Sequence, residues 1–528
     1  MQDRGRLMRR PSRLREVATI GAIAGLVAFL TINRLGASDV CGSNEAVEAI
    51  FLQQMVEHGQ WLFPLDNGRD PMYKPPLFHW TAASLDRLLG IGHVTAFDLR
   101  LTSALYASAG ALLTTAFALA RLGLEGSVIS GLVLAASYEY VSQGRIGRVD
   151  MTLTFFETLS LVSFLAWLEA SQSIGARRKA LHYLLAASLG LGVLAKGPVG
   201  LLLPGGAIGI FLALEKRWSD VRQLLTPLPA TLACILASSW YLAGLLGRQF
   251  GLLTRQVGSE NLGRFFGALG RMPAWYYVQP LLLNAGPLSL MVPPIVGIAL
   301  ARYRGDRPGG VADGEAHADR MARLLAVFWV VTVIFFEMAA YKRKAYLLPL
   351  SPASALLIAW WVCRYGIPRL GRFVPGAIAA ICAAFIIGNF FFIPWREAKD
   401  CGARLTLGET LRWPFEGRQR TGQIRSRQTD SYRQEAAEVN QVVGKEDPLF
   451  VYGLDQSIEP LVFYLDRNIT PLASPLEDAP RGYILVPAAV LKSLSAHPSR
   501  FGEVLIAPGG ADSLALLRSH RAGGESGS

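Results

Sequence analysis

The sequence of 528 residues lacks several patterns that would assign it to a common class of soluble protein. Its five cysteines do not form a zinc-binding pattern. Its formal charge is +12, but the basic residues occur in short clusters between apolar blocks, without a continuous basic face or a nucleic-acid-binding motif. We also find no internal repeat. These absences argue against a zinc site and against nucleic acid as a partner.

Hydrophobic residues, by contrast, make up 51% of the chain and occur in blocks long enough to span a bilayer. The basic N-terminal segment 1–15 precedes an apolar run at 17–32 without a small-residue cleavage site, which predicts a retained first helix. The sequence therefore predicts an α-helical polytopic membrane protein with about 11 to 13 transmembrane helices. The blocks lie near 17–35, 98–120, 126–143, 151–170, 181–195, 199–214, 224–246, 275–300, 322–340, 346–363 and 374–394.

Basic clusters between the blocks predict how the chain crosses the membrane. Residues 177–179, 216–217, 302–323 and 364–372 all fall on the same side as the N-terminus, and an excess of lysine and arginine marks the cytoplasmic side. The outer side then carries residues 36–97, the turn near Asp150, 247–274, 341–345 and everything after about 395.

The outer loop 36–97 is too long to be a simple turn, and its sequence predicts two helices lying on the membrane surface. Ser43 is expected to cap the first, which presents an apolar stripe at Val47, Ile50, Phe51 and Met55 and ends near Gly59. Proline at 75 or 76 begins the second helix, which stops at Gly90.

The C-terminal part of the chain becomes polar after Pro394. We expect a linker at 396–430, a small outer α/β domain at 431–520 with strands at PLFVYG and YILVP, and a disordered tail at 521–528. Residues 1–395 then form the membrane domain. Cys41 and Cys401 are both predicted outside, where they can pair in an oxidising compartment; two free thiols are the alternative.

Acidic residues at the predicted outer side are candidates for chemistry. Asp150 stands at the outer end of a span, where a carboxylate is costly unless it is solvated or paired. The structural alternative is a capping aspartate that pairs with Arg148. Asn44 and Glu45 form a second group of polar residues. Helix capping and the helix dipole explain this pair almost as well as a role in chemistry does.

Cations also gather on the outer side. Lys74, in MYKPPLFHW, stands at a helix N-terminus, where free N–H groups favour an anion, so a lysine there completes a phosphate site. Lys196 lies between two short spans, and Lys342, Arg343 and Lys344 break the positive-inside trend. Snorkelling is the alternative for each lysine taken singly.

Glycosyl transfer from a polyprenyl-phosphate sugar needs outward acids, outward cations and a membrane groove together. Its leaving group is a lipid phosphate, so preorganised cations stabilise the transition state. A carboxylate takes the proton of the acceptor hydroxyl, and no nucleotide-bound metal is required.

Six segments in order resemble a family. The chain resembles the polytopic GT-C glycosyltransferases, in the branch of the bacterial protein O-mannosyltransferases and the lipid A aminoarabinose transferase, over about residues 10–395. The matching segments are NEAVEAIFLQQMVEHGQW, MYKPPLFHW, RVDMTLTFF, AKGPVGLLLP, ENLGRF followed by PAWYYVQP, and KRKAYLLPLSP.

The resemblance implies roles for particular residues. The lipid phosphate is surrounded by Lys74, Lys196 and the cluster Lys342, Arg343 and Lys344, with Arg264 and Tyr346 in the same cavity. Asp150, Asn44 and Glu45 face the sugar and the acceptor as the catalytic group.

This chain departs from the family at three positions. Asn44 replaces the usual first aspartate, so either Glu45 or Asp150 serves as base, or the acceptor is already an anion. Tyr73 and Asn261 replace an acid and a histidine of the aminoarabinose branch, which argues against a divalent metal there and against aminoarabinose as the sugar.

The function that the sequence favours is an inverting glycosyltransferase of the bacterial inner membrane. It is expected to be a monomer, with no cofactor assigned and a divalent metal doubtful. It transfers a sugar from a polyprenyl-phosphate donor to lipid A, another envelope glycan or lipid, or protein, on the periplasmic side. The alternatives are a lipid or small-molecule transporter using the same basic cavity and an inactive envelope scaffold. Transporters are commonly built from internal repeats, which this sequence lacks.

Overall fold

The computed structural model is mostly helical in the part of the chain that it describes, and it divides into two compact units. The first unit comprises Met1–Asn33, Tyr73–Phe78 and Leu101–Phe390. The second comprises Arg34–Met72, His79–Arg100 and Phe391–Ser528, so most of the loop predicted at 36–97 groups with the C-terminal part of the chain. The described residues are 13–170, 175–268, 270–284, 286–302, 313–366, 371, 373–401, 432–453, 458–472, 480–487, 490–491, 504–506 and 514–519.

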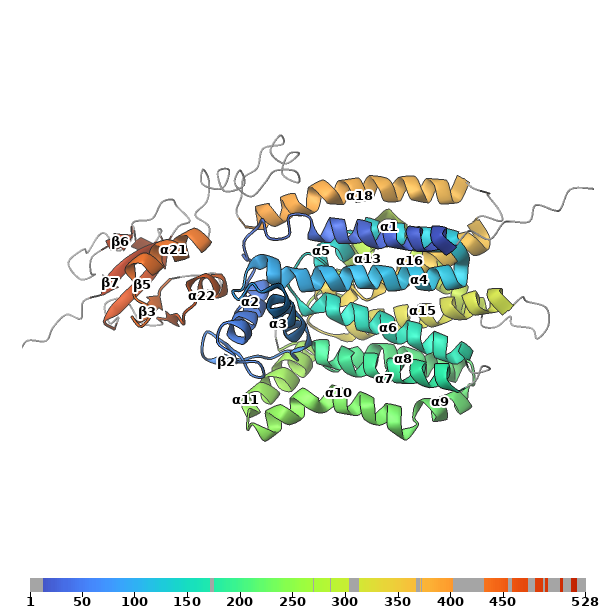
Figure 1. Ribbon diagram of the computed structural model, residues 1–528, viewed down its shortest axis with the longest axis horizontal. Coiled ribbons are helices and arrows are strands. Elements are labelled where there is room, and N and C mark those ends of the chain that lie inside the picture. The colour runs from blue at the N-terminus through green and yellow to red at the C-terminus, as the bar shows by residue number, and fades with distance from the viewer. Residues whose placement is uncertain are drawn as a thin grey trace, which may run out of the picture. The chain divides into compact units, whose positions relative to one another are not determined.

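Helices make up the first unit (Figure 1). Six described helices are long and apolar enough to cross a membrane: α1, α4, α6, α10, and parts of α15 and α18. The chain is therefore a multi-pass membrane protein, as predicted. The helical segments are α1 (Arg13–Ile32), α4 (Ala96–Ala136), α5 (Tyr138–Gln143), α6 (Val149–Glu169), α7 (Ala176–Lys196), α8 (Val199–Leu214), α9 (Trp218–Leu224), α10 (Pro227–Leu246), α11 (Phe250–Leu253), η2 (Thr254–Gly263), α12 (Arg264–Phe266), η3 (Ala274–Tyr277), α13 (Val278–Asn284), η4 (Gly286–Met291), α14 (Val292–Ala301), α15 (Asp313–Met338), η6 (Lys344–Leu347), α16 (Leu350–Trp361), η7 (Val362–Gly366) and α18 (Phe373–Asp400).

The segment α4 covers most of two predicted apolar blocks, and the chain reverses direction between them. Gly123 has φ 72° and ψ −170°, which is not helical. The Ser127 hydroxyl donates to the carbonyl of Thr115 at 2.9 Å. Residues twelve apart in a straight helix are about 18 Å apart along the axis, so this hydrogen bond requires two antiparallel helices joined at Gly123. The two blocks are thus separate helices, as the sequence predicts.

The block at 275–300 is broken, although the sequence predicts one span there. It forms η3, α13, η4 and α14 in succession. Prolines occur at 273, 280, 287, 293 and 294, and each lacks the N–H that a continuing helix uses. The segment is apolar, as predicted, but its recurring prolines prevent one continuous helix.

Arg145 fixes the end of α1 against the turn before α6. Its side chain is buried, and Nη1 donates to the carbonyls of Leu30 at 2.9 Å and Asn33 at 2.8 Å. The last carbonyls of a helix lack partners within the helix, and a cation there is favourable. This contact holds the start of α6, which carries Asp150.

The second unit contains a small α/β domain, as predicted. In its sheet β3 is parallel to β4 and β5, and β7 is antiparallel to β5 and β6, in the order β4-β3-β5-β7-β6. The predicted linker beyond Cys401 and the predicted tail lie outside the described residues. The elements of this unit are α2 (Ser43–Val56), β1 (Leu65–Asp66), β2 (Asp70–Pro71), α3 (Leu77–Leu89), α21 (Tyr432–Val442), β3 (Leu449–Val451), α22 (Glu459–Leu465), β4 (Thr470–Pro471), β5 (Gly482–Pro487), β6 (Val504–Ile506) and β7 (Leu514–Ser519), with α3 beginning and α18 ending across the division between the units.

The first predicted surface helix, α2, differs from the expectation in two respects. Gly42, rather than Ser43, is its N-cap residue, and no side chain caps it. It is also buried on nearly all sides, with nine successive residues from Glu45 to Gln53 buried, rather than presenting one apolar stripe. Several segments of the same unit cover α2: α22 packs along it, His79 of α3 pairs with Glu48, and Arg100 of α4 pairs with Glu45. The sequence of α2 alone does not reveal these contacts.

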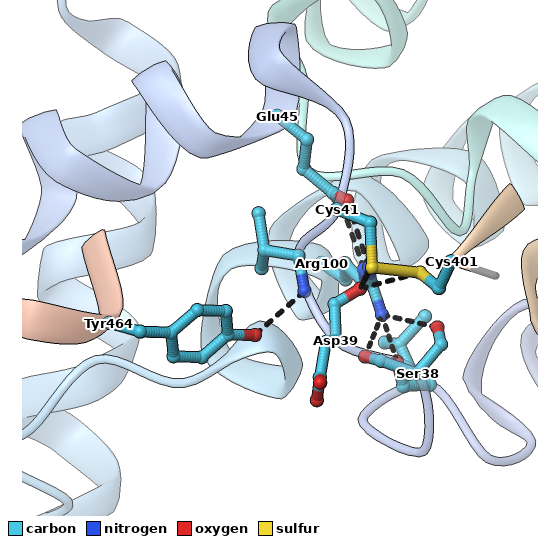
Figure 2. The surroundings of a disulfide bond; sticks show 9 residues. Ser38, Asp39, Cys41, Glu45, Arg100, Cys401 and Tyr464 are labelled. Carbon is cyan, nitrogen blue, oxygen red and sulfur yellow. Dashed lines mark hydrogen bonds and ion pairs between the residues drawn. A yellow bond between two sulfur atoms is a disulfide. The ribbon is translucent and has the colours of Figure 1, made fainter. Parts of the chain in front are cut away.

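A disulfide joins Cys41 to Cys401, with Cα atoms 5.4 Å apart, and decides between the two alternatives left open by the sequence (Figure 2). The two cysteines are 360 residues apart in the chain but belong to the same compact unit. Nearby, the N–H of Val40 donates to the Tyr464 hydroxyl oxygen at 2.8 Å. Burial raises the pKa of Tyr464 above its usual range. Both interactions connect the residues after α1 to the C-terminal part of the chain.

We expect Cys401→Ser to destabilise the second unit by about 2–4 kcal/mol, because the disulfide restricts the unfolded chain. The measurement is the thermal unfolding temperature of the purified protein, with and without reductant. Cys234→Ser, which changes a free and exposed cysteine, is the matched control. Equal unfolding temperatures for Cys401→Ser and Cys234→Ser would contradict the prediction.

Candidate functional site

Asp150 lies in the first turn of α6 and is 2% exposed. Its Oδ1 atom accepts a hydrogen bond from Lys196 Nζ at 2.5 Å, and Arg148 Nη2 lies 3.2 Å from Oδ2. Lys74 is also close enough to interact with this carboxylate electrostatically. A buried carboxylate is stable only when cations and hydrogen bonds compensate for the lost water, and this one has two cationic neighbours in direct contact.

The turn between α7 and α8 positions Lys196 beside this aspartate. Gly197 follows it with φ 92°, a conformation that favours glycine. Gly192 and Gly200 bring α7 and α8 into backbone contact, because a Cβ atom at Gly200 would lie 2.2 Å from the Gly192 carbonyl. The end of α7 is therefore held closely, and Lys196 Nζ also lies 4.8 Å from the centre of the Tyr346 ring.

A cavity of about 420 Å³ opens next to Lys196, within the first unit. Its wall includes cationic and hydroxyl groups as well as phenylalanine and aliphatic side chains. A cavity of this size and mixed character suits a ligand that has both a polar and an apolar part. The lining residues are Tyr73, Lys74, Lys196, Pro198, Val199, Leu202, Gln256, Val257, Glu260, Asn261, Leu262, Arg264, Phe265, Phe266, Phe335, Phe336, Ala339, Tyr341 and Tyr346.

Four residues predicted from the sequence meet in this cavity: Lys74, Lys196, Arg264 and Tyr346. Arg264 forms an ion pair with Glu260, and its Nη1 donates to the Tyr346 hydroxyl at 3.3 Å. Lys74 is 9% exposed, and its Nζ lies 5.2 Å from the Tyr73 ring centre. The wall therefore carries three cations and one carboxylate, which favours an anionic ligand.

The predicted cluster at 342–344 lies outside the described lining of the cavity. Lys342 is 2% exposed and pairs with Glu337. Arg343 Nε donates to the Tyr341 hydroxyl at 3.4 Å, and Lys344 interacts electrostatically with Glu139. A direct role of this cluster in phosphate binding stays a prediction.

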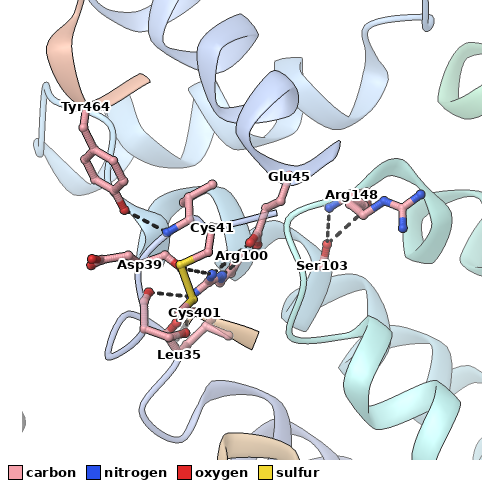
Figure 3. A network of polar contacts seen from close by, with 11 residues as sticks. Leu35, Asp39, Cys41, Glu45, Arg100, Ser103, Arg148, Cys401 and Tyr464 are labelled. Atoms are coloured by element: carbon pink, nitrogen blue, oxygen red, sulfur yellow. Dashed lines mark hydrogen bonds and ion pairs between the residues drawn. A yellow bond between two sulfur atoms is a disulfide. The ribbon is translucent and has the colours of Figure 1, made fainter. Parts of the chain in front are cut away.

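Glu45 belongs to the second unit, where Arg100 binds both of its carboxylate oxygens at 2.7 and 2.8 Å (Figure 3). The Arg100 guanidinium also donates to Ser38 and to the carbonyls of Leu35 and Asp39, so it ties the chain before α2 to the start of α4. Asn44 precedes Glu45 in the first turn of α2. This network gives Glu45 a structural explanation, while its catalytic role stays a prediction.

Comparisons with known proteins support the resemblance stated from the motifs. A family model described as dolichyl-phosphate-mannose-protein mannosyltransferase matches residues 53–248. An undecaprenyl phosphate-alpha-4-amino-4-deoxy-L-arabinose arabinosyl transferase from Edwardsiella ictaluri is 27% identical over 59% of this chain and 53% of its own length. An uncharacterized protein from Aquifex aeolicus is 25% identical over 63% of this chain and 62% of its own. The chain thus matches less than two thirds of the length of either relative.

Solved structures match over nearly the whole chain. ArnT from Cupriavidus metallidurans, bound to undecaprenyl phosphate, has a TM-score of 0.70 at 17% identity and covers 97% of this chain and 99% of its own. The archaeal oligosaccharyltransferase AglB from Archaeoglobus fulgidus has a TM-score of 0.56 at 11% identity, with 91% and 70% covered. The chain has the GT-C fold. At these identities the structural likeness establishes the fold. The predicted resemblance to the mannosyltransferase and aminoarabinose transferase branch is confirmed.

The aminoarabinose branch has an acid and a histidine at two positions of the cavity. In this chain neither position carries a side chain that binds metals well. Both positions line the cavity, but they are Tyr73 and Asn261. The Asn261 amide nitrogen donates to the carbonyl of Gln256 at 2.8 Å, which orients this side chain toward the protein. Neither residue is a strong ligand for a divalent metal ion, so we derive no step through a metal.

A second group of potential metal ligands lies in the second unit, at Glu57, His58 and Asp466. Its ligand atoms lie within 4.8 Å of one another, and Glu57 and His58 are exposed. Lys445 Nζ lies 3.3 Å from the Asp466 carboxylate and already compensates its charge. We assign no metal to this group.

Glu157, which the sequence analysis did not single out, is a buried acid two turns after Asp150 on α6. It is fully buried, and neither carboxylate oxygen has a hydrogen-bond partner among the described residues. An ionisable residue inside an apolar span is itself a signal for function, which would have identified this position from sequence. Lys196 interacts electrostatically with Glu157 as well as with Asp150.

We expect Glu45→Gln to lower stability by about 3–5 kcal/mol, because it leaves the buried Arg100 guanidinium without a compensating charge. The measurement is the thermal unfolding temperature. Glu438→Gln removes the charge of an exposed glutamate in the same unit and is the matched control. If Glu45→Gln unfolds at the wild-type temperature but stops turnover, the residue is catalytic rather than structural.

Glu157→Met is expected to raise the unfolding temperature, because it removes a buried carboxyl without a partner, a group that costs about 1–3 kcal/mol. Glu157→Gln has a similar shape but keeps a polar group, and it should unfold at a lower temperature than Glu157→Met. Destabilisation by both substitutions would mean that the carboxyl makes a stabilising interaction.

Proposed function

We propose that the chain is an integral membrane glycosyltransferase that moves a sugar from a polyprenyl-phosphate donor to an acceptor, with inversion at the anomeric carbon. The observation that carries this proposal is the cavity that Lys74, Lys196 and Arg264 line together with apolar side chains. The names of the relatives agree with it, since they describe an arabinosyl transferase that uses undecaprenyl phosphate and a mannosyltransferase that uses dolichyl phosphate.

The cationic part of the cavity is suited to the donor phosphate. Charge builds up on the phosphate as the bond to the sugar breaks, and cations held in place before the reaction stabilise that charge. Arg264 is oriented by Glu260 and Tyr346, and Lys196 by Asp150, so both are ordered by protein contacts. Phe265, Phe336 and Leu202 in the same cavity are suited to the first isoprene units.

Asp150 is our candidate for the group that accepts the proton of the acceptor hydroxyl. Lys196 contacts both Asp150 and the cavity, so a bound phosphate competes with the aspartate for the same ammonium group. Donor binding would then weaken the hold of Lys196 on Asp150 and leave the carboxylate more basic. The aspartate and the departing phosphate are coupled in this scheme through one lysine.

The sugar and the acceptor are defined only by class. Tyr73 and Asn261 change the cavity wall relative to the aminoarabinose branch, which supports a different sugar. The acceptor classes are lipid A, another envelope lipid or glycan, and protein. Asn44 provides no carboxylate, so proton transfer at that position is not part of the proposal.

We propose that the site and the C-terminal domain face the periplasm and that the N-terminus is cytoplasmic, in the bacterial inner membrane. The Cys41–Cys401 disulfide supports an oxidising compartment for the second unit. The distribution of arginine and lysine supports the same orientation. We further propose residues 1–395 as the catalytic domain, 396–430 as a linker and 431–520 as a separate domain, with the protein acting as a monomer.

Transport without chemistry is the second candidate, because the cavity alone would also bind a lipid phosphate. A transporter does not need a carboxylate next to the cation that holds the phosphate. The contact between Asp150 and Lys196 therefore favours the enzyme.

In vesicles supplied with a labelled polyprenyl-phosphate sugar and envelope extract as acceptor, we expect the protein to release free polyprenyl phosphate. Asp150→Asn should lower the rate by 100-fold or more, as general bases contribute about 10²–10⁴-fold. Lys74→Ala should lower it through weaker donor binding and transition-state stabilisation. The measurement is label separated by thin-layer chromatography.

Lys445→Ala, at a lysine whose side chain is 81% exposed, is the control and should retain activity. Lys74→Ala and Lys445→Ala should unfold near the wild-type temperature. Asp150→Asn leaves Lys196 and Arg148 without their carboxylate and should unfold at a lower temperature, so the rates are compared at a temperature where all the variants are folded. Movement of the label across the bilayer with its glycosidic bond intact would support the transporter instead.

A further inference from the structure

A second cavity lies in the first unit, away from the proposed donor site. It measures about 350 Å³ and is formed by α7, α8, α9 and α10, which lie together in Figure 1. Its described lining is almost entirely apolar, since only His182 and Cys234 contribute polar side-chain atoms. Pockets of this size hold small ligands or parts of larger ones. The apolar wall requires a hydrocarbon occupant rather than a sugar or a nucleotide.

The two ends of this cavity differ. Near one end Gly190 brings α7 into close contact with α10, because a Cβ atom there would lie 2.9 Å from the Ala233 carbonyl oxygen. At the other end His182 Nε2 lies 3.2 Å from the Leu224 carbonyl oxygen, and Arg178 bonds to Gln223, so α7 meets α9. The start of α7 and α9 therefore border the same end of the cavity.

Basic residues lie in the first turn of α7 and on α9, the two segments that border that end. Arg177 and Lys179 at the start of α7, and Arg222 on α9, are exposed. The acids nearby already have partners: Arg217 lies 2.6 Å from Asp220, and Arg323 lies 3.0 Å from Glu215. The exposed cations thus give this end an excess of positive charge, which is complementary to a lipid phosphate.

The position of this end along α7 distinguishes it from the proposed donor site. Lys179 and Lys196 are seventeen residues apart on one helix, or about 25 Å at 1.5 Å per residue. That separation is close to the hydrocarbon thickness of a bilayer. The basic end thus lies at the opposite membrane surface from Lys196.

We propose that this cavity binds an acyl chain of an anionic phospholipid, with Arg177, Lys179 and Arg222 holding the headgroup phosphate. The lipid belongs to the leaflet opposite the proposed donor site and takes no part in glycosyl transfer. Trp218 and Leu225, which are 60% and 70% exposed, border the same end and suit the interface between headgroups and chains. This site is independent of the proposed function, because it needs none of the residues of the donor cavity.

The test uses the full-length protein in detergent, with native mass spectrometry to count bound lipids. Phosphatidylglycerol and phosphatidylcholine with the same acyl chains are added in equal amounts. The wild type should retain phosphatidylglycerol at least tenfold better. The triple variant Arg177→Gln, Lys179→Gln, Arg222→Gln should lose most of this preference, and Ala233→Phe, which fills the cavity, should reduce retention of the lipid itself.

The matched control removes three exposed cations elsewhere, through Arg13→Gln, Arg15→Gln and Lys399→Gln, and should bind as the wild type does. Equal retention of the two lipids by the wild type, or equal loss in both triple variants, would overturn the proposal. Added undecaprenyl phosphate should not displace the phosphatidylglycerol. If it does, and if Lys74→Ala prevents the displacement, the cavity belongs to the donor instead.

Discussion

The contact between Lys196 and Asp150 is the interaction on which the rest of the candidate site depends. It joins the end of α7 to the start of α6, and both ends are fixed independently of it. The α7–α8 turn is held by glycine contacts, and the α6 start is held by Arg145 on the carbonyls of α1. A carboxylate with 2% exposure is stable only because this lysine and Arg148 accompany it. The lysine consequently has a defined place on the cavity wall before any ligand arrives.

Much of this arrangement could be predicted from the sequence. Apolar blocks gave the membrane helices, and the order of six short motifs gave the fold family. Lys74, Lys196, Arg264 and Tyr346 were grouped from motif positions and do line one cavity. Each lysine taken singly could be a snorkelling side chain, so the order of the motifs, rather than any one residue, identified the group.

Other features depend on contacts between distant segments, which sequence patterns do not encode. The burial of α2 results in part from packing by α22, some four hundred residues later in the chain. Arg100 lies in an ordinary helical segment, and only the fold shows that it binds Glu45 and three residues of the segment before α2. The proline-broken region 274–301 was apolar enough to suggest one helix, although its proline spacing was visible.

The disulfide has a further consequence for how the protein is made. Cys41 follows the first membrane helix, while Cys401 follows α18, the last one described. Chains are synthesised from the N-terminus, so the first cysteine must wait until nearly all of the membrane part has been inserted. A prematurely terminated chain would keep Cys41 reduced, and the cross-link therefore marks molecules whose membrane part has been synthesised to its end.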